Sequence, residues 1–156
     1  MKEQEREYVP LEKKITYPLY LCTKEIIRQY SLKLEKYHLT YTQYLVMQYF
    51  WEKKTSNVKE IGKTLLLDSS TLTPLLKKLE SKGFITRKKS NLDERNLVLE
   101  LTKKGEKLKN EVNDVPYEMR EKSKINEKEA EELKRILMKF LNGLVEEYKN
   151  EHEKNK

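Results

Sequence analysis

A short run of hydroxyl-bearing residues, followed at helical spacing by lysines, carries the side chains best suited to binding another molecule. The members that lie off its leucine stripe are Ser69, Ser70, Thr71, Thr73, Pro74, Lys77 and Lys78. Serine and threonine hydroxyls donate and accept hydrogen bonds, and a lysine ammonium attracts phosphate. A helix that begins with small residues of this kind can enter the major groove of DNA, where its first residues reach base edges. Because threonine methyls and a proline ring also fit against a thymine methyl, the segment predicts base-specific contacts with DNA.

A second group of charged residues follows in a stretch with the pattern of a β-hairpin: Arg87, Lys88, Lys89, Asp93 and Arg95. Arg95 falls in the predicted hairpin tip, where an arginine suits a narrow minor groove, and Asp93 is near enough to orient it by a salt bridge. The other three basic residues are placed for phosphates. Residues 57–104 contain eleven lysines and arginines against six acids, so this stretch carries +5, most of the chain's net charge of +7. Contact with DNA phosphates requires such a local concentration of positive charge.

Each of these features also has a purely structural explanation when it is taken singly. A Ser, Thr or Asp before a leucine stripe is usually a helix N-cap, and a run of lysines is usually a solvated helix face. The joint order of short helix, tight turn, polar-started helix and basic hairpin favours DNA binding over those explanations.

Capping signals and apolar periodicity predict the elements that position these residues. A capping-box pattern starts a helix at Thr40, Asn57 precedes a helix over 58–65, and Asn126 precedes the last helix. The helix that carries the hydroxyl residues has its N-cap among residues 68–70 and ends at Gly83. The remaining predictions are a helix over 17–37, a polar turn at 53–56, strands over 84–89 and 96–101, a helix over 102–113, a break at 115–116, and fraying after 148. This order predicts a mainly α fold with a small β-hairpin wing, a winged helix-turn-helix.

Several classes of function are disfavoured by what the sequence lacks. The single cysteine, Cys22, cannot form an intramolecular disulfide, and no apolar run approaches the ~20 residues needed to span a bilayer. Residues 1–8 are charged and lack the apolar core of a signal peptide, so we expect a soluble cytoplasmic protein with no membrane partner. No cysteine–histidine cluster has metal-ligand spacing, and neither a phosphate-binding glycine loop nor a nucleophile elbow occurs. We therefore predict no enzyme activity, no metal and no cofactor.

At the helix that carries the hydroxyl residues, the sequence resembles the MarR family of winged-helix regulators, and within it the branch that senses organic hydroperoxides (OhrR-type). The motifs that carry the resemblance are Leu39-Thr40-Tyr41-Thr42-Gln43-Tyr44-Leu45, Leu67-Asp68-Ser69-Ser70-Thr71-Leu72-Thr73-Pro74-Leu75-Leu76-Lys77-Lys78-Leu79-Glu80, Asp93-Glu94-Arg95 and Leu101-Thr102-Lys103-Lys104-Gly105. The resemblance covers nearly all of the chain. It implies a homodimer that binds double-stranded DNA at a palindromic operator, usually represses, and releases DNA when it is oxidised or liganded.

The same resemblance implies a division of the chain into three parts of one domain. Residues 1–38 would form an N-terminal tail and a dimerisation helix, residues 39–104 the DNA-binding region, and residues 105–156 the C-terminal dimerisation helices and a charged tail. Charged residues make up 38% of the chain and hydrophobic residues 37%, which is a thin core for 156 residues. A partner subunit is therefore expected to complete the apolar helix faces.

The sensing chemistry of the hydroperoxide branch is not reproduced in this sequence. In that branch a reactive cysteine precedes a Leu-Tyr pair, and two further tyrosines lie near it; the pair here is Leu19-Tyr20, and the tyrosines match Tyr30 and Tyr41. The position of the cysteine is occupied by Thr16. A threonine hydroxyl is not ionised at neutral pH and cannot form the sulfenic acid that starts the switch.

Cys22 is the only thiol left to act as a sensor. It lies six residues after Thr16, about 600° around a helix, so the two side chains point in different directions. It continues the apolar stripe of Ile15, Leu19 and Ile26, which favours a buried core residue. The alternative is that the redox sensor has moved to Cys22.

Three functions thus compete. The first is a DNA-binding regulator that is constitutive or answers a small ligand or another protein. The second is a regulator that senses oxidants through Cys22, and the third is a protein-interaction module that has lost DNA binding. The basic segment at 57–104 favours the first two.

Overall fold

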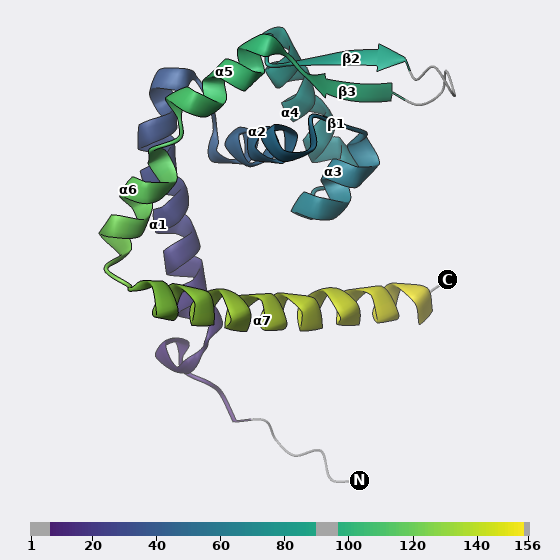
Figure 1. The fold of residues 1–156 in the computed structure, drawn as a ribbon. Coiled ribbons are helices and arrows are strands. Elements are labelled where there is room, and N and C mark those ends of the chain that lie inside the picture. The colour runs from purple at the N-terminus through teal and green to yellow at the C-terminus, as the bar shows by residue number, and fades with distance from the viewer. Residues whose placement is uncertain (1–6, 90–96, 155–156) are drawn as a thin grey trace. The chain divides into compact units, whose positions relative to one another are not determined.

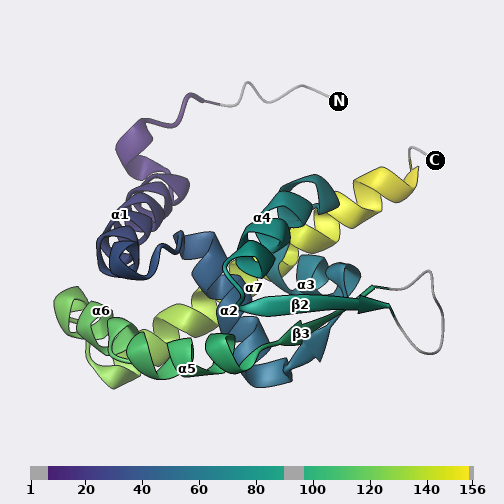
Figure 2. The ribbon, with the colours of Figure 1, turned by 90° about the horizontal axis from the view of Figure 1, so that it is seen from above.

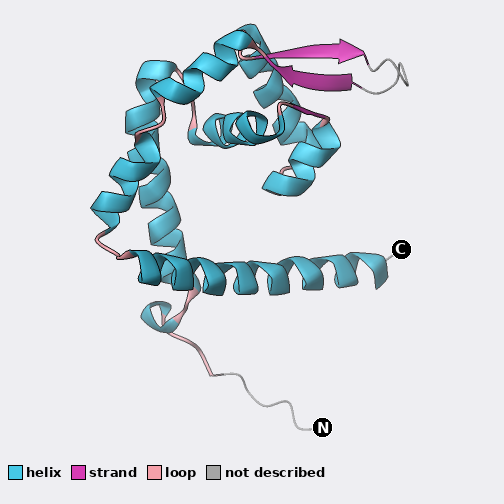
Figure 3. Ribbon diagram, in the orientation of Figure 1, coloured by secondary structure: helices cyan, strands magenta, loops and turns pink. Residues whose placement is uncertain are grey.

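The computed structural model describes residues 7–89 and 97–154, so Asp93 and Arg95 of the predicted wing lie outside the described residues. In chain order the elements are η1 (Leu11–Lys13), α1 (Thr16–Leu34), η2 (Glu35–Tyr37), α2 (Tyr41–Lys53), β1 (Thr55–Ser56), α3 (Val58–Leu65), α4 (Ser69–Ser81), β2 (Ile85–Lys89), β3 (Leu97–Leu101), α5 (Lys103–Glu111), α6 (Val115–Ser123) and α7 (Glu127–Lys154), where η is a 3-10 helix (Figures 1 and 3). The fold is mainly helical with a small sheet, as the sequence predicts. Its contacts divide the chain into an N-terminal unit of residues 1–115 and a C-terminal unit of residues 116–156.

Side-chain caps begin the helices of the N-terminal unit where the sequence predicts them. Before α2, the Thr40 hydroxyl accepts from the Gln43 N–H and the Gln43 side chain accepts from the Thr40 N–H, each at 3.2 Å. Before α3, Asn57 Oδ1 accepts from the Glu60 N–H at 2.9 Å. Each cap satisfies a backbone donor that has no partner within its helix, and the two helix starts are confirmed.

Three segments differ from the prediction. The first helix ends at Leu34 and continues as η2, which His38 closes in a left-handed conformation with φ of 55°. The expected polar turn at 53–56 contains β1, which pairs with β3. The break at Val115 is confirmed, but a separate helix, α6, begins there. Pro116 is tolerated because the first turn of a helix leaves its N–H groups unpaired in any case.

The sheet of the N-terminal unit is antiparallel, with the strand order β1–β3–β2. β2 is an edge strand, and Arg87 on it lies opposite Leu99 of β3. Figure 2 shows α4 lying beside β2. The core beneath them includes the buried side chains Tyr44, Phe50, Ile61, Leu72, Leu76, Leu79, Ile85 and Leu99. Trp51 joins this core and donates from Nε1 to the Gly105 carbonyl oxygen at 2.8 Å.

The C-terminal unit consists of α7 and the part of α6 that follows Val115. A reciprocal capping box starts α7, in which the Asn126 N–H donates to Glu129 Oε2 at 2.8 Å and the Glu129 N–H donates to Asn126 Oδ1 at 3.0 Å. The helix, predicted to fray after Tyr148, continues to Lys154. One of its faces leaves large apolar side chains exposed, namely Leu133, Ile136, Leu137, Met138, Leu141 and Leu144.

The helix α1 also exposes large apolar side chains: Ile15, Tyr20, Leu21, Ile26, Ile27 and Leu32. Soluble monomers rarely leave such continuous apolar surface uncovered. Within the described residues no helix is both long enough and apolar enough to cross a membrane.

Candidate nucleic-acid interface

The helix α4 has one buried face and one exposed face. Leu72, Leu76 and Leu79 point inward and are at most 1% exposed. All seven residues that the sequence predicts for DNA contact are exposed: Ser69, Ser70, Thr71, Thr73, Pro74, Lys77 and Lys78. The buried leucines anchor the helix in the core, so the polar residues are presented on a rigid support.

Asp68 organises the start of α4. Its Oδ1 accepts from the Thr71 N–H at 2.7 Å and from the Ser70 hydroxyl at 2.5 Å, and its Oδ2 accepts from the Thr71 hydroxyl at 3.2 Å. These bonds, that from Ser70 foremost, hold the pKa of the Asp68 carboxyl below its ordinary value. The two hydroxyl protons are directed at Asp68, so both oxygens present their lone pairs outward as acceptors.

Pro74 is the sixth residue of α4 and lies beyond its first turn. A proline has no N–H, so the carbonyl of Ser70, four residues earlier, lacks its ordinary helical donor.

The other end of α4 is attached to the corner between η2 and α2. The Lys82 ammonium donates to the His38 carbonyl oxygen and, at 3.1 Å, to Gln43 Oε1, the atom that also caps α2. Burial lowers the pKa of Lys82, and the nearby charge of Lys78 lowers it further. Sequence patterns do not predict this junction, because no spacing rule connects a lysine to a carbonyl 44 residues away.

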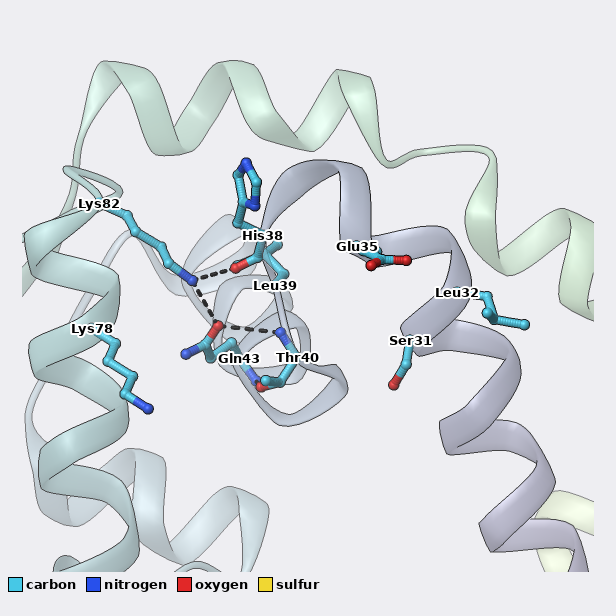
Figure 4. A pocket seen from close by; sticks show the side chains of 9 residues that line it. All are labelled: Ser31, Leu32, Glu35, His38, Leu39, Thr40, Gln43, Lys78 and Lys82. Atoms are coloured by element: carbon cyan, nitrogen blue, oxygen red, sulfur yellow. Dashed lines mark hydrogen bonds between the residues drawn. The ribbon is translucent and has the colours of Figure 1, made fainter.

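An open cavity of about 620 Å³ lies beside this junction, lined by Ser31, Leu32, Glu35, His38, Leu39, Thr40, Gln43, Lys78 and Lys82 (Figure 4). Figure 4 shows residues of α1 on one side and the two lysines of α4 on the other. Most of its lining residues have polar or charged side chains, and the lysines give its α4 side a positive charge.

Two basic residues of β2, Arg87 and Lys88, have acidic neighbours. Arg87 Nε lies 2.9 Å from Glu80 Oε2 in the last part of α4, and the Arg87 side chain is only 23% exposed. Lys88 Nζ lies 2.5 Å from Glu100 Oε2 across the sheet, and Lys88 remains exposed. The backbone of Lys89 pairs with that of Leu97.

The base of the hairpin is joined to α5 by Thr102. Its hydroxyl donates to the Gly83 carbonyl oxygen at 2.6 Å and accepts from the Gly105 N–H at 3.0 Å. Gly83 has φ of 75°, a conformation that favours glycine and that reverses the chain between α4 and β2. The orientation of the hairpin where it leaves α4 is therefore held by several hydrogen bonds.

Two of the predicted sensing residues lie together in an aromatic cluster. The rings of Tyr30 and Tyr41 have centroids 4.7 Å apart, and Tyr44 lies 5.7 Å from Tyr30. Burial raises the pKa of Tyr30 and Tyr41, and burial with the two neighbouring phenols raises the pKa of Tyr44 to about 12. All three phenols are therefore neutral at physiological pH.

The other predicted sensing residues, Thr16, Tyr20 and Cys22, are exposed on α1 and lie outside this cluster. The preferred interpretation of Cys22 as a buried core residue is wrong for the single chain. Its stripe on α1 is apolar, but Ile15 and Ile26 on the same stripe are exposed as well. Elsewhere in the described residues no group of three or more His, Cys, Asp and Glu side chains is placed to hold a metal ion.

Comparisons with known proteins agree with this geometry. The family described as transcriptional regulator SarA/Rot matches residues 28–112. The organic hydroperoxide resistance transcriptional regulator of Bacillus subtilis is 38% identical over 153 residues, which cover 98% of this chain and 99% of that protein. The HTH-type transcriptional regulator SarZ of Staphylococcus saprophyticus is 39% identical over 132 residues, which cover 85% of this chain and 90% of that protein. Among solved structures, the MepR–DNA complex of Staphylococcus aureus has a TM-score of 0.76 at 27% identity and covers 83% of this chain and 98% of its own.

Proposed function

The chain belongs to the SarA/Rot family of transcriptional regulators, which here has a MarR-type winged-helix fold, and we propose that it binds a palindromic operator as a homodimer. It is a sequence-specific DNA-binding regulator and acts as a repressor. A protein that works on chromosomal operators acts in the cytoplasm, where we expect this chain to be found.

The observation that carries the proposal is the exposed face of α4. Hydroxyls at its start and two lysines stand on a helix whose opposite side is buried in the core. Helix-turn-helix proteins read the major groove with a helix of this construction. The solved MepR relative is itself a complex with DNA.

We assign a role to each group of exposed residues. The side chains from Ser69 to Pro74 would contact bases, while Lys77 and Lys78 would lie near the DNA backbone. In the hairpin, Lys88 and Lys89 would face phosphates, and Arg95, oriented by Asp93, would enter the minor groove.

The dimer would be built from residues 1–38 and 105–156, with residues 39–104 between them as the DNA-binding region. The support for this division is the exposed apolar surface of α1 and, independently, of α7. A second copy of the chain can cover both surfaces, as obligate dimers cover their apolar faces.

The proposed function is tested by selecting binding fragments from a random double-stranded DNA pool and titrating the selected operator at physiological salt. Thr73→Ala removes a hydroxyl and a methyl from the groove-facing end of α4, so it should weaken binding about tenfold and relax the preference at one base position. The control is Ser81→Ala, which removes a hydroxyl from the far end of the same helix and should bind normally. A wild-type protein that selects no sequence would reject the proposal and favour a protein-interaction module.

A second candidate is that oxidants regulate DNA binding through Cys22. The observations in its favour are that this sole thiol is exposed and that a relative is named for organic hydroperoxide resistance. Organic hydroperoxide should then release the operator from the wild type but not from Cys22→Ser. If both proteins stay bound, the thiol sensor is wrong and the regulator is constitutive or answers another signal.

A further inference from the structure

We propose that Glu80 is a positioning residue for DNA binding, because its ion pair with Arg87 braces the wing against α4. The wing is the hairpin of β2 and β3, and the residues between the two strands lie outside the described part of the chain. The proposal rests on the proposed DNA-binding function and assigns Arg87 to a brace within the protein, in place of the phosphate contact expected from the sequence.

The geometry of the pair supports the brace. Arg87 Nε lies 2.9 Å from Glu80 Oε2, and the two side chains are 23% and 38% exposed. Arg87 Nε and Nη2 are both buried and have no well-aligned hydrogen bond in the described part of the chain. Glu80 supplies the charge that balances this largely buried guanidinium, so the pair is held by position and charge.

The brace adds a charged contact to the packing of the sheet against α4. The Thr102 hydroxyl fixes the base of the hairpin at Gly83. Further along β2, Lys88 pairs with Glu100 of β3, so that ion pair stays within the sheet. Among the described ion pairs, Glu80–Arg87 is therefore the one that joins β2 to α4.

This position matters because α4 and the wing must reach the DNA together. β2 is an edge strand, so its outer side has no neighbouring strand to hold it. Binding through α4 and the wing is tight only when the free protein already holds them in the relative orientation that they have on DNA. Without Glu80 the guanidinium would lose its counter-charge and turn toward solvent, and the wing would gain freedom relative to α4.

If Arg87 has a competing role as a phosphate contact, the expected effect of Glu80→Gln on operator affinity is the opposite. If Arg87 contacts a phosphate, Glu80 competes with the DNA for it in the free protein. Glu80→Gln would then release Arg87 and strengthen binding, and the loss of one negative charge acts in the same direction. If Glu80 is a brace, Glu80→Gln weakens binding in spite of that charge change.

The test measures operator affinity at several salt concentrations for Glu80→Gln, Arg87→Gln, the double variant and the exchanged pair Glu80→Arg/Arg87→Glu. We expect each single variant to bind about tenfold more weakly, the double variant to be no worse, and the exchanged pair to regain most of the affinity. The matched control is Glu106→Gln, which removes the same charge from an exposed pair with Lys54 at 2.7 Å in the same unit and should not weaken binding.

The effect of Glu80 should also depend on the wing tip. In an Arg95→Ala background, Glu80→Gln should cause little further loss, because the element that it positions no longer reaches the groove. A general loss of stability would lower affinity in both backgrounds, and thermal unfolding of each variant, with Arg87→Lys as the conservative change, detects it.

The remaining outcomes overturn the proposal. Tighter binding by Glu80→Gln makes Arg87 a phosphate contact. If Glu80→Gln binds the operator as tightly as the wild type, Glu80 has no positioning role. The same follows if Glu80→Gln weakens binding equally in the wild-type and Arg95→Ala backgrounds. In both cases the proposed DNA binding still stands. A wild-type protein that binds no selected DNA removes the proposed function and this inference together.

Discussion

Asp68 has two roles at the start of α4. It is the N-cap, because its carboxylate accepts from the Thr71 N–H, and it also accepts from the hydroxyls of Ser70 and Thr71. The same carboxylate thus stabilises the helix and sets the direction of two groups that we assign to base contact. Because these hydroxyls are already oriented, DNA binding would not have to order them.

Asp68 should make the stability of the fold depend on pH. Its folded-state pKa lies below the ordinary value of 3.8, so its carboxylate stabilises the folded chain at every pH above that value. The contribution is lost as pH falls from 3.8 through the lowered pKa. In urea unfolding, Asp68→Ala should be less stable than the wild type at pH 7, and the difference should shrink below pH 3.8. Asp68→Asn keeps a capping oxygen and should lose less at pH 7; an equal loss would mean that charge alone matters.

Local residue patterns could be predicted from the sequence, and contacts across the fold could not. The caps at Thr40, Asn57 and Asp68 depend on residues three positions apart, which the sequence displays directly. The Lys82–His38 bond depends on tertiary packing, as does the direction in which Arg87 leaves an edge strand. The stripe that includes Cys22 was identified as apolar, but periodicity does not show what covers it.

The backbone of α5 approaches the wing closely at Gly105. A Cβ added to Gly105 would lie 2.3 Å from the Phe84 carbonyl oxygen and 2.7 Å from Leu101 Cδ1. The backbone of α5 can approach the hairpin this closely only because residue 105 has no side chain. The sequence predicted the hairpin and α5, as it predicted α2, α3 and α4, but it did not predict β1 or α6. A two-residue strand and a helix that begins Val-Pro both give weak local signals.

Substitution of two helical glycines should have opposite effects on stability. Gly105→Ala must displace backbone at Phe84 and should cost about 1–3 kcal/mol or more. Gly143 in α7 has no atom within 4 Å of an added Cβ. Gly143→Ala should therefore stabilise its helix by about 0.5–1 kcal/mol. Urea unfolding followed by Trp51 fluorescence reports the first change, since Trp51 donates to the Gly105 carbonyl, and far-ultraviolet dichroism reports the second. A Gly105→Ala variant as stable as wild type would contradict the close approach.

At the scale of the whole molecule, the exposed apolar faces of α1 and α7 require a partner. Together they present large side chains that a monomer would leave in contact with water. A twofold dimer brings two copies of α4 to one side of a duplex, and half-sites one helical turn apart, roughly 34–36 Å, then match a palindrome. DNA recognition therefore depends on dimerisation, because one winged-helix region alone makes too few contacts for tight specific binding.

Placing a charge on the apolar face of α7 should therefore abolish dimerisation and operator binding together. Leu141 is 37% exposed in the single chain and lies among the other apolar residues of that face. Leu141→Lys would bury an unpaired ammonium in the interface, at a cost of several kcal/mol. Glu146→Lys places a lysine at an exposed position about 140° around the helix from Leu141, and should leave a dimer that binds normally. Sedimentation velocity gives the oligomeric state, and titration of full and half operators gives the affinity. A Leu141→Lys protein that remains dimeric would place the interface elsewhere, whereas a monomer that still binds the full palindrome at wild-type affinity would show that recognition does not need the dimer.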